Sequence, residues 1–152
     1  MLLVFFGLPA TGKTFLAKEI SKELGFQYLN MDNTNRNAVA EEILFSKMCE
    51  FLEGKLSAGK GFVVDGSFSV GSERNRIKEI AEKKGIPVVF IEMIAPEETL
   101  IERMPEARKL ALYRKMQEQF EPMEEPHFTV DSSRPFKKQM DGVKFYIEKI
   151  RK

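Results

Sequence analysis

The chain has little of what marks a secreted, membrane-bound or polyanion-binding protein. Its single cysteine, Cys49, permits no intrachain disulfide, and its position on an apolar helix face predicts a buried, unreactive thiol. Lysine and arginine together number 24 and aspartate and glutamate 23, so no overall field attracts nucleic acid or a membrane surface. The apolar run 2–6 is too short for a membrane span and, unlike a signal peptide, has no basic residues before it. We therefore expect a cytoplasmic protein with no membrane partner.

Repeats and low-complexity segments are also missing, and apolar and amphipathic stretches simply alternate. A length of 152 residues with 43% apolar content fits one domain over residues 1–152. Short apolar runs typical of strands occupy residues 2–6, 26–31, 61–65, 88–94 and 128–131. Helical spacing fills the intervals, at residues 13–24, 38–56, 74–84, 96–104, 106–120 and 136–150. The pattern predicts an α/β protein in three layers, with a five-stranded parallel sheet that binds its ligands at the carboxyl ends of the strands.

What the chain does contain is a phosphate-binding loop between its first strand and first helix. The stretch Gly7-Leu8-Pro9-Ala10-Thr11-Gly12-Lys13-Thr14 fits the G-x-x-x-x-G-K-[ST] pattern at every fixed position. Such a loop turns its backbone N–H groups inward around phosphate, at the positive end of the helix that follows. Lys13 is expected to reach the β- and γ-phosphates, and the Thr14 hydroxyl is expected to bind Mg²⁺. The sequence therefore predicts a nucleoside triphosphate and Mg²⁺ as ligands.

A second part of the same site is predicted at Asp65, which ends the apolar run 61–65. A carboxylate at the end of a strand beside the phosphate loop holds Mg²⁺, directly or through water, and orients Thr14. This shared metal site requires the two strands to be neighbours, which gives the strand order 2-3-1-4-5. The alternative is an aspartate that only caps the following turn.

Asp32 and Arg36 follow the second predicted strand, where an acceptor would enter the site. A carboxylate at this point can take the proton of an attacking hydroxyl, and an arginine can hold an anionic acceptor or screen phosphate charge. The alternative is an ordinary helix start, because Asp32, Asn33 and Thr34 are all good caps.

The segment from about residue 103 to 126 predicts a helical lid over the triphosphate. It carries Arg103, Arg108 and Arg114, and basic residues on a closing helix can stabilise charge on the transferring phosphoryl group. Arg103 is expected to contact the nucleotide. Because glutamates alternate with these arginines, the segment also fits a solvated helix.

Taken together, these stretches resemble the small predicted ATPase/kinase family of phosphate-loop proteins that includes the kinase domain of bacteriophage polynucleotide kinase. The resemblance runs from residue 3 to about 131. Its points of match are Gly7 to Thr14, Asp32 with Arg36, Val64-Asp65-Gly66-Ser67-Phe68, Ser72-Glu73-Arg74, Glu102-Arg103 with Arg108, Tyr113-Arg114-Lys115-Met116, Phe120-Glu121-Pro122 and Glu125-Pro126.

The resemblance implies an ATP-dependent kinase in which Asp32 is the general base, Arg36 contacts an acceptor phosphate and Arg108 contacts the transferred phosphate. The spacings from Asp32 to Arg36 and from Glu102-Arg103 to Arg108 are each one residue longer than in the phage enzyme. No Asn-Lys-x-Asp tetrapeptide for reading guanine occurs, and the turn at 131–135 is a candidate for contact with the base.

The acceptor stays open between a polynucleotide 5′-hydroxyl and a small molecule, and a nucleotide-dependent ATPase or switch that transfers phosphate only to water is the alternative function. A polynucleotide needs a basic groove and stacking aromatics, for which Arg36, Arg74, Arg76 and Phe68 are candidates. A phenylalanine in the position of Phe68 more often packs its loop against the core. The carboxylates of Glu41, Glu42 and Glu73 lie close to them in sequence and would repel phosphates.

Overall fold

Five parallel strands form the centre of the fold, and their order confirms the predicted one. In the computed structural model, residues 1–32, 38–104 and 106–152 are described, with all their side chains except those of residues 38–41 and 108–109. The sheet has the order β2-β3-β1-β4-β5. Its members are β1 (Leu2–Phe6), β2 (Gln27–Asn30), β3 (Phe62–Asp65), β4 (Val88–Ile94) and β5 (Phe128–Asp131).

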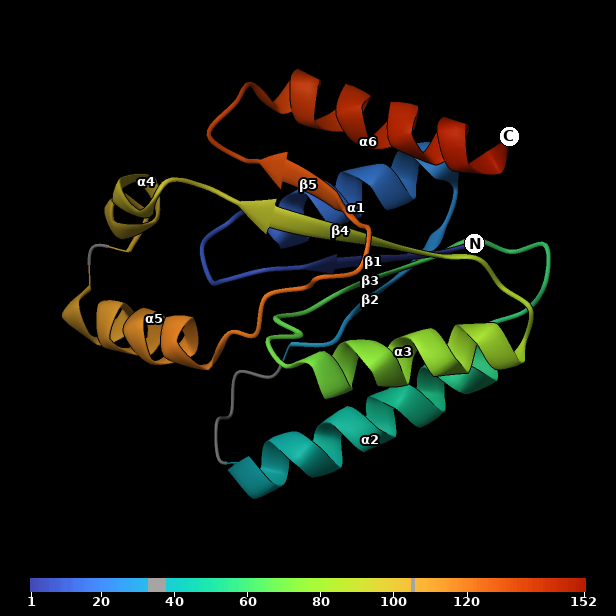
Figure 1. Cartoon of the computed structure of the whole chain (residues 1–152), viewed down its shortest axis with the longest axis horizontal. Coiled ribbons are helices and arrows are strands. Elements are labelled where there is room, and N and C mark those ends of the chain that lie inside the picture. The colour runs from blue at the N-terminus through green and yellow to red at the C-terminus, as the bar shows by residue number, and fades with distance from the viewer. Residues whose placement is uncertain (33–37, 105) are drawn as a thin grey trace.

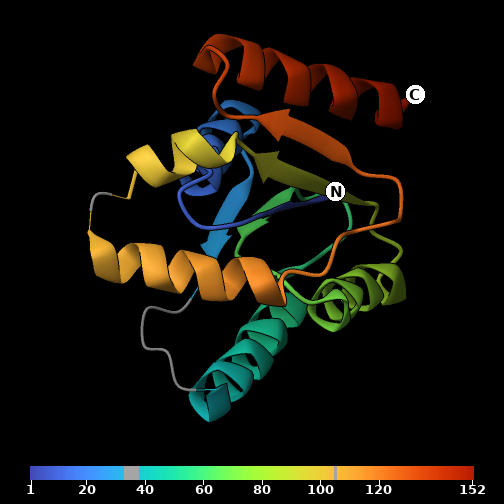
Figure 2. The same cartoon turned by 60° about the vertical axis from the view of Figure 1, so that its left-hand side comes forward.

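Helices cover both faces of this sheet. Figure 1 shows α1 (Lys13–Leu24) and α6 (Phe136–Arg151) on one face, and α2 (Ala38–Lys55) and α3 (Gly71–Lys83) on the other. The short α4 (Glu97–Glu102) and α5 (Ala107–Gln119) lie beyond the carboxyl ends of the strands, as Figure 2 also shows. The three predicted layers are therefore present, and α4 and α5 stand at the edge where ligands of such sheets bind.

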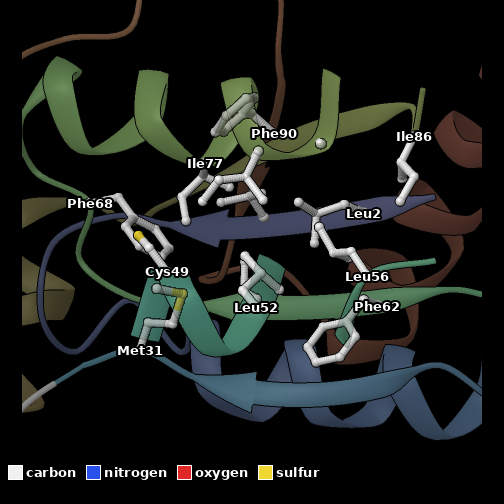
Figure 3. Close-up of a cluster of buried hydrophobic side chains, with 14 of the residues drawn as sticks. Leu2, Met31, Cys49, Leu52, Leu56, Phe62, Phe68, Ile77, Ile86 and Phe90 are labelled. Carbon is white, nitrogen blue, oxygen red and sulfur yellow. The ribbon is translucent and has the colours of Figure 1, made fainter. Parts of the chain in front are cut away.

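The central strand β1 contributes to the core on both faces, because its side chains alternate and all five are fully buried. Leu2 packs with Leu52 and Ile77 against α2 and α3, as Figure 3 shows, whereas Leu3 packs against α1 and α6. Cys49 belongs to the first of these clusters, and burial raises the pKa of its thiol to about 11. The predicted unreactive thiol is consistent with this environment.

The helix after β3 starts earlier than its apolar pattern predicts, at Gly71 rather than Arg74. Val70 is extended and its carbonyl accepts from the backbone N–H groups of Glu73 and Arg74, which closes the first turn. Apolar periodicity does not reveal this turn because its residues are polar. Among the helices within the described ranges, none is long and apolar enough to cross a membrane.

Candidate active site

The loop between β1 and α1 has the backbone shape that a phosphate-binding nest requires. Gly7 has φ +149°, and a Cβ there would lie 2.5 Å from the carbonyl oxygen of Met93. Gly12 is left-handed, with φ +83°, directly before α1 begins at Lys13. The buried Thr11 hydroxyl donates to the Leu8 carbonyl at 2.8 Å and closes the loop on itself. Only a residue without a side chain fits at Gly7, so the glycine of the motif has a steric reason.

Asp65 and Thr14 meet at the end of β3, as the predicted metal site requires. The Thr14 hydroxyl donates to Asp65 Oδ1 at 3.0 Å, and the Tyr28 hydroxyl donates to Oδ2. Burial raises the pKa of the Asp65 carboxyl, while the bonds from Tyr28 and Thr14 lower it in part. Burial, followed by the bond to Asp65, also raises the pKa of Tyr28. A buried carboxylate beside a hydroxyl supplies oxygen ligands of the kind that Mg²⁺ takes together with phosphate oxygens and water, so these residues fit the ion.

Asp32 lies beside the phosphate loop, between Lys13 and the loop that follows β3. Its Oδ2 is 3.4 Å from Lys13 Nζ, and Lys13 is only 8% exposed. Its Oδ1 accepts from the Ser67 backbone N–H at 2.7 Å and from the Ser67 hydroxyl at 3.0 Å. Asp32 is therefore a carboxylate held in a fixed orientation, next to the lysine that the motif assigns to the β- and γ-phosphates.

Arg103 joins the phosphate loop to the loop between β5 and α6. Its Nη1 donates to the Ala10 carbonyl at 2.8 Å and to the Ser132 hydroxyl at 3.0 Å, and its Nη2 donates to the Ser132 carbonyl at 3.1 Å. Both predicted nucleotide-contacting segments therefore meet at this one guanidinium. Arg114, in contrast, pairs with Glu97 and holds α5 against α4.

The α4–α5 hairpin rests on the phosphate loop through a small apolar cluster. Leu100, Met104 and Tyr113 are its buried members, and Leu8 and Ala10 of the loop pack against them. Arg36 and the side chain of Arg108 lie outside the described residues, so their predicted roles stay predictions. Residue 105, between the two helices, also lies outside them.

Two residues proposed for the acceptor entrance have other roles. Phe68 is 3% exposed and packs in the core against Phe45, so it offers no surface for stacking a base. Arg74 is 4% exposed, and its guanidinium donates to the Phe68 and Glu121 carbonyls at 2.6 and 2.7 Å. For Phe68 the structure favours the alternative, a phenylalanine that packs its loop against the core. The acceptor contact predicted for Arg74 is wrong, because the backbone carbonyls of Phe68 and Glu121 hold its guanidinium in the interior.

Arg76, the third basic candidate, lines a cleft of about 500 Å³ between α2 and α3, to which the last residue of α5 also contributes. The lining is polar and of mixed charge, with three serines and a glutamine among its ten residues: Glu42, Phe45, Ser46, Cys49, Ser69, Val70, Ser72, Glu73, Arg76 and Gln119. Ser69 and Val70 of the lining come from the loop that follows the carboxyl end of β3, so this part of the cleft lies near the carboxyl edge of the sheet.

Sequence reasoning missed Tyr28 of the site, and it gave no role to Ser67. A signal for Tyr28 exists, because Asn30 pairs with Asp65 in the parallel register and alternation then puts Tyr28 on the same face as Asp65. Ser67 lies in the stretch Val64-Asp65-Gly66-Ser67-Phe68 that carries the family resemblance, but serine after a strand end is ordinary in a turn, so no role followed from it. Its two hydrogen bonds to Asp32 depend on how β2 and β3 come together.

A protein family described as "AAA domain" matches residues 2–123. Among solved structures, the fold is similar to a gluconokinase from Sinorhizobium meliloti 1021, with a TM-score of 0.75 and 17% identity over 98% of this chain and 94% of that one. The APS kinase CysC from Mycobacterium tuberculosis in complex with AMPPNP and APS has a TM-score of 0.74 and 15% identity over 97% of this chain and 96% of that one. Kti12 from Chaetomium thermophilum in complex with ADP-AlF3 has a TM-score of 0.73 and 16% identity over 95% of this chain and 98% of that one.

At these identities the structures show a shared fold, the five-stranded phosphate-loop fold of small kinases. The family match is more informative, because it extends over far more than half of the chain and includes the phosphate loop, Asp32, Asp65 and Arg103. The chain belongs to the AAA domain family.

Proposed function

We propose that the protein is an ATP-dependent phosphotransferase that moves the γ-phosphate of ATP to a hydroxyl group. The observation that carries the proposal is Asp32, which is oriented by Ser67 and lies 3.4 Å from Lys13 Nζ. A carboxylate beside the γ-phosphate end of the loop is in reach of an acceptor hydroxyl. The likeness to a gluconokinase and an APS kinase supports the same reaction class.

In this reaction the loop amides and Lys13 hold the phosphates and gather their negative charge. Thr14 and Asp65 would hold Mg²⁺, which would neutralise part of the negative charge on the phosphates. Asp32 accepts the proton of the acceptor hydroxyl at a carboxylate oxygen as the new bond from the acceptor oxygen to the γ-phosphorus forms. The bond between the γ-phosphorus and the β,γ-bridging oxygen breaks, and ADP leaves. Arg103 keeps the nucleotide-facing loops together, and Arg108 is proposed as the lid residue on the transferred phosphate.

For the acceptor we propose a small hydroxylated molecule bound in the cleft between α2 and α3. Ser69 of the cleft is two residues from Ser67, which spans at most about 7 Å of chain, so the cleft begins close to Asp32. Two glutamates, Glu42 and Glu73, line the cleft together with one arginine, Arg76, and this balance of charge suits hydroxyl groups better than a row of phosphates. A polynucleotide 5′-hydroxyl remains the second acceptor, through the resemblance and Arg36.

The test is transfer of label from [γ-³²P]ATP across sugars, nucleosides and 5′-hydroxyl oligonucleotides. We expect labelling of a small hydroxylated molecule, and Asp32→Asn is expected to reduce it by at least a hundredfold while the affinity for ATP changes less than threefold. Asp141→Asn, an exposed carboxylate on α6, is the matched control and should keep full activity.

Each outcome of the screen decides between the candidates. Labelling of oligonucleotides alone, weakened by salt, would replace the small acceptor by a polynucleotide. Labelling of no acceptor, with normal ATP hydrolysis, would reject the kinase and leave the ATPase or switch. Equal loss of ATP binding and transfer in Asp32→Asn would make Asp32 a structural residue.

A further inference from the structure

Residues 66–71, which form the loop after β3 and the first residue of α3, connect three separate parts of the site. Its Ser67 carbonyl accepts from the Gly7 N–H at 3.4 Å, and Ser67 itself donates twice to Asp32. The Ser69 carbonyl accepts from the Glu121 N–H at 2.7 Å, and the Gly71 N–H donates to Glu121 Oε2 at 3.0 Å. One short loop thus touches the phosphate loop, the proposed base and the segment that follows α5.

The side chain of Arg74 connects the loop after β3 to the segment that follows α5 through hydrogen bonds. Its two terminal nitrogens donate to backbone carbonyls from distant segments, at Phe68 and at Glu121. The guanidinium carbon lies 5.3 Å from the centroid of the Phe6 ring and 5.8 Å from that of Phe120. A planar group with donors spread along a rigid fork can bridge two carbonyls at once, whereas a lysine ammonium in the same place is a single point.

The carbonyl that Arg74 holds belongs to a strained residue. Phe68 has φ +38°, in the left-handed region that a residue with a bulky side chain rarely adopts. Its ring lies against Gly66, where a Cβ would come within 3.0 Å of Phe68 Cζ. Burial of the ring and the bond from Arg74 keep Phe68 in this conformation, and the conformation sets the direction of the preceding residue, Ser67.

We infer that Arg74 is a positioning residue for Asp32. Through Phe68 it fixes the Ser67 donors that orient the Asp32 carboxylate, and through Glu121 it ties that orientation to the segment leaving α5. The position of the α4–α5 hairpin over the phosphate loop is thereby linked to the orientation of the Asp32 carboxylate. This inference rests on the proposed function for the role of Asp32, while the link itself is a property of the fold.

The first test is hydrogen exchange with and without Mg-AMPPNP, a probe that needs no acceptor. In the wild-type protein we expect the nucleotide to slow exchange at residues 107–119 and also at 66–71. In Arg74→Lys we expect slowing at 107–119 only. Arg151→Lys, the same change at an exposed arginine at the end of α6, should behave as the wild type. Slowing of both segments in Arg74→Lys, or no slowing at 66–71 in the wild type, would overturn the inference.

The second test is steady-state turnover of Mg-ATP with the acceptor labelled most strongly in the transfer screen, or with water where none is labelled. Arg74→Lys is expected to lower kcat at least tenfold with less than a twofold change in KM for ATP. The acid limb of its pH–rate profile is expected to move to higher pH, because loss of the Ser67 hydrogen bonds favours the protonated form of the base. An unchanged profile, or a parallel loss of ATP binding and turnover, would leave Arg74 a residue of the core only.

Glu121→Ala is a second variant that tests the same link if Arg74→Lys does not fold. This substitution removes only the exposed carboxylate that accepts from the Gly71 N–H. It is expected to lower kcat about threefold with KM for ATP unchanged, and to weaken the exchange response of residues 66–71. Wild-type values in both measurements would contradict the link. Failure of the wild type to label any acceptor would reject the proposed kinase activity, but the exchange experiment would still decide the link.

Discussion

Asp65 is a carboxylate with no exposed surface, and its environment opposes its own charge. Burial raises the pKa of Asp65 in the folded state above the ordinary value of 3.8 that applies to the unfolded chain. At a pH between the unfolded and the folded pKa, the folded state therefore binds the proton more tightly than the unfolded state. The contribution of Asp65 to stability therefore falls as the pH rises through its folded pKa. The proposed Mg²⁺ site requires the charged form of Asp65, whereas the neutral form favours the folded state.

Asp65→Asn is accordingly expected to separate stability from function. The amide keeps the shape of the carboxyl without its charge, so the free energy of unfolding at pH 7 should equal or exceed that of the wild type, by about 1 kcal/mol. Mg²⁺-dependent turnover should be lost. Urea unfolding at pH 7 and at pH 4 measures the difference, which should shrink at the lower pH. A variant that is less stable than the wild type at pH 7 would show that the charge stabilises the fold.

Gly7 offers a test of the phosphate loop that involves no charge. In Gly7→Ala the new Cβ would meet the Met93 carbonyl at 2.5 Å and the backbone has φ +149°, so we expect a loss of about 2–4 kcal/mol of stability and no ATP binding. Gly59→Ala is the control for the backbone alone, because Gly59 has φ +83° and nothing within 4 Å. Its cost should stay near 1 kcal/mol in urea unfolding. Equal losses in the two variants would mean that the contact with Met93 has no effect.

At the scale of elements, the strands and their order were predictable because one chemical requirement reaches across the sheet. The predicted Mg²⁺ site requires Thr14 and Asp65 to be neighbours, and this requirement places β3 next to β1 before any packing is considered. Apolar runs such as Leu2–Phe6 and Val88–Ile94 are long enough to identify strands that are buried on both faces. The helix after β3 was predicted too short because its first turn is polar and capped by backbone alone.

The contacts between helices, strands and loops could not be predicted, because no local pattern in the sequence indicates them. Arg74 stands in a charged helix, and arginine is usually exposed, so nothing in its neighbourhood predicts a buried guanidinium. Its partners are backbone carbonyls at Phe68 and Glu121, and any residue supplies a carbonyl. Ser67 likewise finds Asp32 only when β2 and β3 lie side by side. Such contacts follow from the assembled sheet and leave no spacing pattern to read.

The α4–α5 hairpin is the element expected to move. Only three buried side chains, Leu100, Met104 and Tyr113, make up its cluster within the described residues, whereas α3 packs into the large core under the sheet. A small cluster opens at low cost, so amide exchange in α5 should be faster than in α3 without nucleotide. Saturating Mg-ATP should slow it in α5 and leave α3 nearly unchanged. Unchanged exchange in α5 would argue against a closing lid.

For the whole molecule, the ligands are expected to bind at one edge of the sheet while the core lies behind it. The phosphate loop, Asp32, Asp65 and the cleft between α2 and α3 all occupy the carboxyl ends of the strands, and both core clusters are formed on β1. A ligand at that edge binds the folded state and has no site in the unfolded chain. The stability of the entire domain should therefore depend on nucleotide and metal concentration.

This dependence gives a thermal measurement with a defined size. At a free Mg-ATP concentration of 100 times Kd, the folded state gains about 2.7 kcal/mol, which for a domain of this length is a rise in Tm of roughly 5–10 °C. Removal of Mg²⁺ with EDTA at constant ATP should abolish most of the increase in Tm, because Thr14 and Asp65 are proposed to contribute to ATP binding only through the ion. Lys13→Met should show little rise with either form of the nucleotide, and Lys138→Met, an exposed lysine on α6, should match the wild type. A wild-type Tm that is indifferent to saturating Mg-ATP would mean that the loop does not bind ATP in the folded protein.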